Sequence, residues 1–276
     1  MKIFLIGSNG QMGTDLVEEL KDYQIYPSGV NITNYKQSRE EIKRISPDLV
    51  INTAAYHNTK ETEKNAKKTF EINAFAVLNI AQACEEVGCP LVQISTDYVF
   101  GEGKAPFSEE DQPDPQSIYG QSKYLAELFT RNTIPAHFIV RTATLFGKAG
   151  CRAKGGGNLP KTILNSTDKE LRFKNDEYTS VTYTKDLAKA IHGMFLMGEY
   201  GTYHLTNKGR VSLYHFAKKV LDLAKIKKEV IPVSRTAFDN FPKPADTSLG
   251  TVKQVKLPAW EDALSRYLYE LEISKS

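Results

Sequence analysis

The 276-residue sequence has few cysteines, no long apolar segment and no marked excess of charge of either sign. Its three cysteines, Cys84, Cys89 and Cys151, are too few for a disulfide framework and lack the spacing of a four-ligand metal site, so free thiols in a reducing compartment are expected. The first apolar run, at residues 3–6, is far shorter than a signal-peptide core or a membrane span. These absences predict a cytoplasmic protein without a bound metal ion.

The charges of the chain are balanced. The 36 Lys and Arg residues exceed the 33 Asp and Glu residues by three, and pairs such as Lys67-Lys68 and Lys218-Lys219 are expected to be solvated helix faces. A balance of this kind gives no strong attraction to nucleic acid or to an anionic membrane surface. We therefore expect neither of them as a partner.

Short apolar runs alternate with helical patterns through the first half of the chain. With 41% hydrophobic residues, the chain can bury one large core or two modest ones. The alternation predicts an α/β protein with a doubly wound, Rossmann-like parallel sheet. The predicted strands cover residues 3–6, 49–51, 91–94, 137–140 and 202–205, and the predicted helices cover 11–21, 38–45, 67–87, 121–132, 188–197, 212–224 and 259–271.

The pattern loosens after Gly147, which predicts a second, smaller lobe towards the carboxyl end. We expect residues 1–147 and 178–205 to form a dinucleotide-binding domain, and residues 148–177 and 206–276 to form a substrate-binding lobe. The stretch 148–158 is rich in glycine and basic residues. It is expected to be a loop, either simply mobile or closing over a substrate.

A glycine-rich turn follows the first predicted strand. In the sequence Gly-Ser-Asn-Gly-Gln-Met-Gly at residues 7–13, Gly7 permits a tight bend, Gly10 allows a pyrophosphate to approach, and the following helix offers N–H donors. The spacing differs by one residue from the commonest dinucleotide fingerprint. The turn nevertheless predicts a dinucleotide site, because it lies between a strand and a helix. The segment 26–31, where the strand after the first helix would end, carries no charge of either sign, so NAD and NADP both stay open.

Three further residues indicate proton chemistry near this turn. Tyr119 and Lys123 are four residues apart, so on a helix both side chains lie on one face, and the ammonium is expected to lower the pKa of the phenol. The same spacing also occurs by chance on exposed helix faces. Thr96 follows a buried strand and either donates to a substrate carbonyl or merely caps the strand end. In a parallel sheet such strand ends share one crevice, so we expect these residues to lie together.

These segments together resemble the dTDP-4-dehydrorhamnose reductase family of the extended short-chain dehydrogenase/reductases. The resemblance rests on residues 7–13, 47–56, 95–100 and 119–123. It implies that Thr96, Tyr119 and Lys123 are catalytic. The residues that it places around the cofactor are Gly7, Asn9, Gly10, Gln11, Met12, Gly13, Asn31, Ile32, Ala54, Ala55, Tyr56, Asn73, Ser95, Tyr119 and Lys123. Asp97, Tyr98 and Asn158 would face a sugar.

The resemblance also implies a reaction. Hydride would pass from NADPH or NADH to the C4 ketone of a nucleotide-linked 4-keto-6-deoxyhexose, a step in polysaccharide biosynthesis, with a homodimer as one assembly to consider. Tyr119 would protonate the developing alkoxide, Lys123 would lower the pKa of Tyr119 and hold the nicotinamide ribose, and Thr96 would polarise the carbonyl.

Other functions stay open at this point. Residues 57–60, 141–144 and 242–244 depart from the usual residues of the family, all on the substrate side, so a different sugar nucleotide is one alternative. An epimerase or dehydratase of the same superfamily is another, since Asp97 could remove a proton. A third is a non-catalytic nucleotide-binding subunit that resembles the regulatory subunit of methionine adenosyltransferase.

Overall fold

The computed structural model of the chain describes residues 1–151, 155–237 and 242–273, with the backbone alone at 272 and 273. In this part of the chain, six strands form one parallel sheet in the order β2-β1-β3-β4-β5-β10. The strands are β1 (Lys2–Ile6), β2 (Gln24–Ser28), β3 (Leu49–Asn52), β4 (Leu91–Thr96), β5 (His137–Thr142) and β10 (Gly201–His204). The predicted doubly wound parallel sheet is confirmed.

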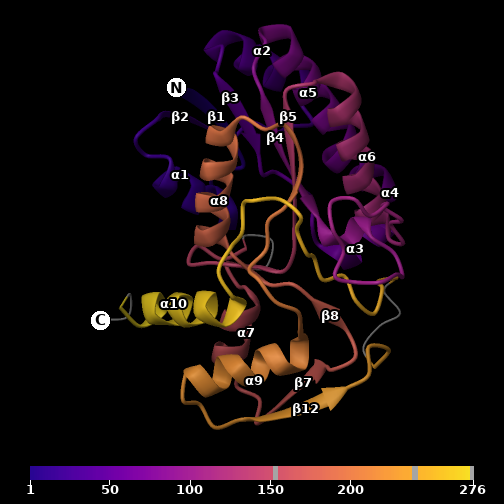
Figure 1. Cartoon of the computed structure of the whole chain (residues 1–276), viewed down its shortest axis with the longest axis vertical. Coiled ribbons are helices and arrows are strands. Elements are labelled where there is room, and N and C mark those ends of the chain that lie inside the picture. Colours follow the sequence, from indigo (N-terminus) through magenta and orange to yellow (C-terminus); the bar gives the residue numbers. More distant parts are fainter. Residues whose placement is uncertain (152–154, 238–241, 274–276) are drawn as a thin grey trace.

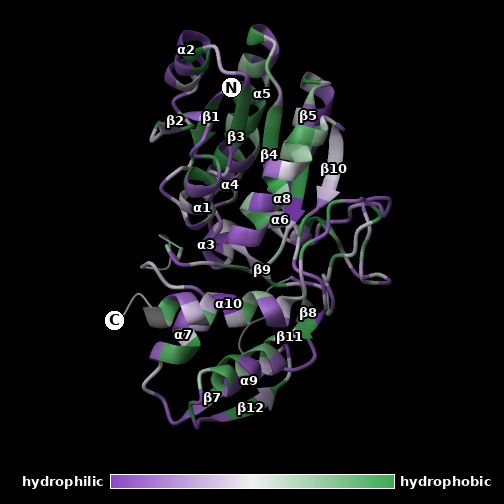
Figure 2. Ribbon diagram, turned by 60° about the vertical axis from the view of Figure 1, so that its left-hand side comes forward, coloured by the Kyte–Doolittle hydropathy of each residue, from purple (hydrophilic) through white to green (hydrophobic). Residues whose placement is uncertain are grey.

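Helices cover both faces of this sheet (Figure 1). α1 (Gln11–Glu19) packs beside α8 (Thr184–Met197) on one face, and α2 (Tyr35–Ile45), α5 (Ala76–Val87) and α6 (Ile118–Thr133) cover the other. Alternate residues of β1 enter separate cores: Ile3 and Leu5 join the core under α1 and α8, whereas Phe4 and Ile6 join the core under α2 and α5. A strand that is buried on both faces is apolar throughout, and Figure 2 shows the central strands in green.

The predicted helix at residues 67–87 is helical throughout but is not one uniform α-helix. It consists of α4 (Ala66–Phe70), a π-helical turn η1 (Glu71–Phe75) and α5. A π turn widens the helix by one residue and often lies at a functional site. A further short helix, α3 (Thr59–Lys64), precedes it and was not predicted.

A second group of elements lies below the main sheet in Figure 1. Here β7 (Glu170–Lys174) pairs with β12 (Glu229–Val233), β8 (Tyr178–Thr179) pairs with β11 (Val211–Ser212), and β6 (Leu145–Phe146) pairs with β9 (Thr182–Tyr183). The helices are α7 (Leu159–Asn165), α9 (Leu213–Leu223) and α10 (Trp260–Ile273). Their apolar residues pack into a separate core that includes Phe146, Tyr183, Phe216 and Tyr267.

The glycine-rich stretch 148–158 has no helix or strand in its described residues, as expected for a loop; residues 152–154 lie outside them. Its two ends meet where the Cys151 amide donates to the Gly157 carbonyl at 2.9 Å. Among the described helices, none is both long enough and apolar enough to cross a membrane.

Candidate active site

The glycine-rich turn between β1 and α1 is closed tightly. Gly7 has a φ of +80°, and the Gly10 amide donates to the Gly7 carbonyl at 2.9 Å. A Cβ atom at Gly13 would lie 2.2 Å from the same carbonyl oxygen, and a Cβ at Gly7 would lie 2.5 Å from the Thr53 hydroxyl of the β3 loop. Side chains are therefore excluded at both positions. The turn lies where β2 and β3 leave β1 on opposite sides, which is the usual ligand crevice of such sheets.

The start of α1 can receive an anion. Its N-cap is Gly10, its first turn holds no acidic residue, and no described side chain caps it. Free N–H groups at a helix amino terminus bind phosphate well. The Gln11 side-chain oxygen is also buried without a hydrogen-bond partner among the described residues, a condition that a ligand can relieve. Met12, by contrast, packs into the core. The uncapped start of α1 and the Gln11 side-chain oxygen therefore fit a bound dinucleotide.

The predicted cofactor residues after β2 differ in exposure. Asn31 is exposed, and its side-chain oxygen accepts from the Thr33 amide at 3.2 Å and from the Thr33 hydroxyl at 2.9 Å. Ile32 is buried in the core under α2 and α5. Of these two predicted residues, Asn31 therefore presents polar side-chain atoms and Ile32 does not.

Asn73 joins the β3 loop to α6 from within the π turn. It is fully buried, and its side chain accepts from the Tyr56 amide at 2.7 Å and donates to the Tyr56 carbonyl at 2.9 Å. It also donates to the Ser122 hydroxyl at 3.1 Å, which in turn donates to the Tyr119 carbonyl at 2.8 Å. Asn73 thus holds the backbone of the predicted pocket segment 54–56 and the first turn of α6 in one arrangement.

Tyr119 lies in the first turn of α6, close to the end of β4. Ser117 caps this helix by accepting from the Gly120 amide at 3.0 Å. A Cβ at Gly120 would lie 2.2 Å from the Tyr98 carbonyl, so glycine lets α6 approach the 3-10 turn η2 (Asp97–Val99). The rings of Tyr98 and Tyr119 meet edge to face at 5.6 Å, and Thr96 shares a hydrogen bond with the Tyr119 side chain. The structure therefore brings the predicted Thr96 and Tyr119 together.

Lys123 lies one turn further along α6 and is only 3% exposed. Its ammonium donates to the Ile94 carbonyl of β4 at 2.6 Å. Burial lowers the pKa of Lys123 to about 8, with Glu127 opposing.

The predicted lowering of the Tyr119 pKa by Lys123 is wrong. Burial raises the pKa of Tyr119, the charge of Asp97 adds to the rise, and the hydrogen bond with Thr96 opposes it. Helical spacing places the two side chains on one face, but it does not reveal that the ammonium turns to the strand backbone or that the phenol is desolvated.

Ser95 contributes to a buried ion pair. Its hydroxyl donates to Glu127 at 2.6 Å, and the Arg141 guanidinium donates to the same carboxylate at 2.9 and 2.7 Å. The side chains of Arg141 and Glu127 are 1% and 0% exposed. This network fixes β4, β5 and α6 to one another. The Ser95 hydroxyl is therefore already hydrogen-bonded within the protein.

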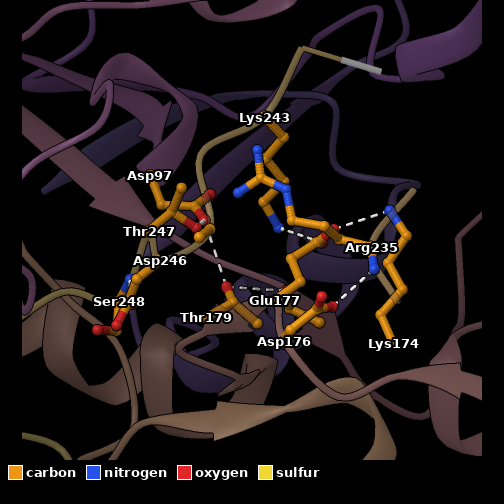
Figure 3. A network of polar contacts seen from close by, with 12 residues as sticks. Asp97, Lys174, Asp176, Glu177, Thr179, Arg235, Lys243, Asp246, Thr247 and Ser248 are labelled. Atoms are coloured by element: carbon orange, nitrogen blue, oxygen red, sulfur yellow. Dashed lines mark hydrogen bonds and ion pairs between the residues drawn. The ribbon is translucent and has the colours of Figure 1, made fainter. Parts of the chain in front are cut away.

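Asp97 is buried and fully engaged at the end of β4 (Figure 3). Its carboxylate accepts from the hydroxyls of Thr96 at 3.1 Å, Thr179 at 3.3 Å and Thr247 at 2.6 Å. Burial raises the pKa of Asp97, and Lys243 opposes this rise most strongly. Sequence analysis did not identify Thr179 or Thr247 as site residues. Lys243 lies in the segment 242–244, which departs from the usual residues of the family.

Asn158, also predicted to face the sugar, caps α7. It is 3% exposed, accepts from the Lys161 amide at 3.0 Å and donates to the Gly147 carbonyl at 2.7 Å and to the Tyr267 hydroxyl at 3.0 Å. Its polar atoms therefore hold the glycine-rich loop, α7 and α10 together. Within the described ranges, no three His, Cys, Asp or Glu side chains converge as metal ligands would.

Comparisons with known proteins identify the family of the chain. Residues 1–273 match the family model of the RmlD substrate binding domain. The chain is 33% identical to the spore coat polysaccharide biosynthesis protein SpsK of Bacillus subtilis, over 98% of this chain and 97% of that protein. It is 30% identical to the dTDP-4-dehydrorhamnose reductase of Salmonella typhimurium, over 98% of each chain. A crystal structure of dTDP-4-dehydrorhamnose reductase from Bacillus anthracis in complex with NADP is similar, with a TM-score of 0.92 and 36% identity over 98% of this chain and 99% of that one.

Proposed function

Because the chain belongs to the family of the RmlD substrate binding domain, we propose that it reduces the C4 ketone of a nucleotide-linked 4-keto-6-deoxysugar with NADPH or NADH. The names of its relatives support this substrate class and a role in polysaccharide biosynthesis. The observation that carries the proposal is the group of Thr96, Tyr119 and Lys123 at the end of β4 and the start of α6, in the same parallel sheet as the glycine turn after β1. A bound reduced nicotinamide would supply the hydride.

Tyr119 acts as the proton donor in this proposal. Burial keeps the phenol protonated at neutral pH, which is the form that a reduction consumes. The oxygen of a developing alkoxide is more basic than a phenolate, so the proton moves towards the substrate. Thr96 then holds the donor in place and can stabilise the phenolate that remains.

Lys123 acts on the cofactor in this proposal. Its ammonium donates to the Ile94 carbonyl and is not among the groups that shift the Tyr119 pKa, so we assign it to cofactor binding. Three N–H donors on one ammonium allow Lys123 to bind ribose hydroxyls while it keeps its bond to Ile94. The glycine turn and the start of α1 would hold the pyrophosphate.

The two lobes bind different ligands in this proposal. We assign dinucleotide binding to residues 1–147 and 178–205, and substrate binding to residues 148–177 and 206–276. The separate core around Phe216 and Tyr267 supports the division. Phe146 and Tyr183 fall within the bounds of the dinucleotide-binding part but pack into that second core.

The position of Asp97 argues against a dehydratase. A carboxylate that removes a substrate proton needs a free oxygen within reach of it. Both Asp97 oxygens already accept hydroxyl groups of the protein. Asp97 is better explained as a residue that holds the end of β4.

The test is a turnover screen with matched controls. Purified protein is incubated with NADPH and NADH in parallel against a panel of nucleotide-linked 4-keto-6-deoxysugars, and the loss of reduced nicotinamide absorbance is followed. We expect oxidation with at least one sugar, and reduction at C4 in the product by NMR. Cofactor binding without oxidation of any sugar would contradict the proposal and favour a binding subunit.

A further inference from the structure

The segment 242–250, here called the strap, reaches the active site from a distant part of the chain. Its Thr247 hydroxyl donates to Asp97 at 2.6 Å, across 150 residues of sequence. The strap backbone pairs with Tyr178 on one side, through its Ala245 carbonyl at 2.7 Å and its Thr247 amide at 3.0 Å. The Gly250 amide donates to the Phe107 carbonyl at 2.7 Å on the other. These backbone hydrogen bonds hold the strap independently of Lys243.

The strap carries a buried cation, Lys243, into this site (Figure 3). Its side chain is 8% exposed, and its ammonium lies 3.0 Å from one oxygen of Glu177, whose other oxygen lies 2.8 Å from Lys174. Burying a charge is costly unless the charge is paired. Burial alone would lower the pKa of Lys243. The neighbouring Tyr98, Asp97 and Glu177 raise this pKa, so the lysine is charged.

Lys243 contacts Tyr98 as well as Glu177. The ammonium lies 5.0 Å from the centre of the Tyr98 ring and shares a hydrogen bond with its side chain. The same ring meets Tyr119 edge to face at 5.6 Å. A continuous set of contacts therefore runs from Glu177 through Lys243 and Tyr98 to the phenol that we assign as the proton donor.

We propose that Lys243 is a positioning residue, which holds the Tyr98 ring against Tyr119 and thereby fixes the proton donor. The inference rests on the proposed function. Without the ammonium, the Tyr98 side chain loses the hydrogen bond and the cation–π contact with Lys243, and the ring can shift relative to Tyr119. A misplacement of about 1 Å near reacting groups can lower a rate by about 100-fold. The glycine turn is a separate structure, so cofactor binding does not depend on Lys243.

The variant Lys243→Met tests this role, because it keeps most of the side-chain length and removes the charge. We expect kcat to fall by about 10- to 100-fold, with an unchanged dissociation constant for NADPH and a smaller change in KM for the sugar. Lys243→Arg should restore most of kcat, since a guanidinium can reach both Glu177 and Tyr98.

Arg210→Met is the matched control. Arg210 also anchors the strap, through an ion pair with Asp246, but its side chain is 49% exposed and it lies over Tyr178 instead of Tyr98. We expect this variant to keep the wild-type kcat. An unchanged kcat in Lys243→Met, or an equal loss in Arg210→Met, would overturn the inference.

Two measurements keep the test decisive. If Lys243→Met does not fold, Glu177→Gln takes its place, because it keeps the side-chain volume and weakens the ion pair with Lys243. An unchanged kcat in a folded Glu177→Gln protein would then refute the positioning role of Lys243. If the wild-type protein oxidises no cofactor, the proposed function fails, and crystal structures decide the inference alone. A Tyr98 ring that stays 5.6 Å from Tyr119 in the variant overturns it, and a displaced ring supports it.

Discussion

The buried ammonium of Lys123 should make the stability of the protein rise with pH through the alkaline range, and Lys123→Met should abolish this rise. Burial lowers the pKa of Lys123 from 10.5 to about 8. Between these two values the unfolded chain holds a proton that the folded protein has released. Because the unfolded state binds more protons there, the free energy of unfolding increases with pH.

The magnitude follows from the difference between the two pKa values. A tenfold change in proton affinity corresponds to about 1.4 kcal/mol, so the folded protein carries a penalty of about 3 kcal/mol below pH 8. About 2.5 kcal/mol of it is relieved between pH 7 and pH 10. Methionine cannot be charged, and the Ile94 carbonyl keeps a second donor, the Gln93 amide at 2.8 Å. The variant should therefore lack the penalty without leaving a buried carbonyl unpaired.

Urea unfolding at pH 7, 8, 9 and 10 measures the effect. Tyrosines of the unfolded chain titrate near the top of this range, and burial raises the pKa of Tyr119 in the folded protein, but these groups are present in both proteins and cancel in the difference. The wild type should gain about 2.5 kcal/mol relative to Lys123→Met between pH 7 and pH 10. Lys36→Met is a suitable control, because that side chain is 86% exposed and should leave the pH dependence unchanged. Parallel curves for the wild type and Lys123→Met would show that Lys123 is not buried, and would refute the reasoning.

Three further outcomes are expected. Tyr119→Phe should bind NADPH normally and lose at least about 100-fold in kcat, because the proton donor disappears with little change in volume; an unchanged kcat in steady-state assays would exclude Tyr119 from the mechanism. Gly13→Ala should weaken NADPH binding in calorimetry, because the added Cβ would lie 2.2 Å from the Gly7 carbonyl and overpacking costs about 1–3 kcal/mol; wild-type affinity would contradict the tight turn. Glu127→Gln should cost about 3–5 kcal/mol in urea unfolding at pH 7, because it leaves the buried charge of Arg141 uncompensated; a loss below about 1 kcal/mol would show that the pair is hydrated.

The main sheet could be predicted from the sequence because local patterns determine it. Strands β1, β3, β4 and β5 are buried on both faces, so each contains a short run of mostly apolar residues, and each lies within two residues of its predicted bounds. The glycine turn has a local cause as well, since two backbone positions there exclude side chains. By contrast, β7 and β12 were not predicted. β7 alternates polar with apolar residues over its five positions, as a half-buried strand does, whereas β12 contains Pro232, which argues against a strand.

The catalytic geometry could be predicted only in part. The meeting of Thr96 with Tyr119 follows from strand order, because the carboxyl ends of parallel strands share an edge. The direction of the Tyr119 pKa depends on desolvation, which sequence spacing does not report. The partners of Asp97 come from segments that pair only in the tertiary structure, and Thr247 is 150 residues away.

That separation also sets an order of events during synthesis. A ribosome that adds about 5–20 residues per second needs about 8–30 s to travel from the codon for Asp97 to the codon for Thr247. During this interval the emerging polypeptide already holds its nucleotide-binding turn but still lacks the hydroxyl and the cation that complete the proton-transfer centre. A nascent chain stalled before residue 242 should therefore retain dinucleotides without consuming them.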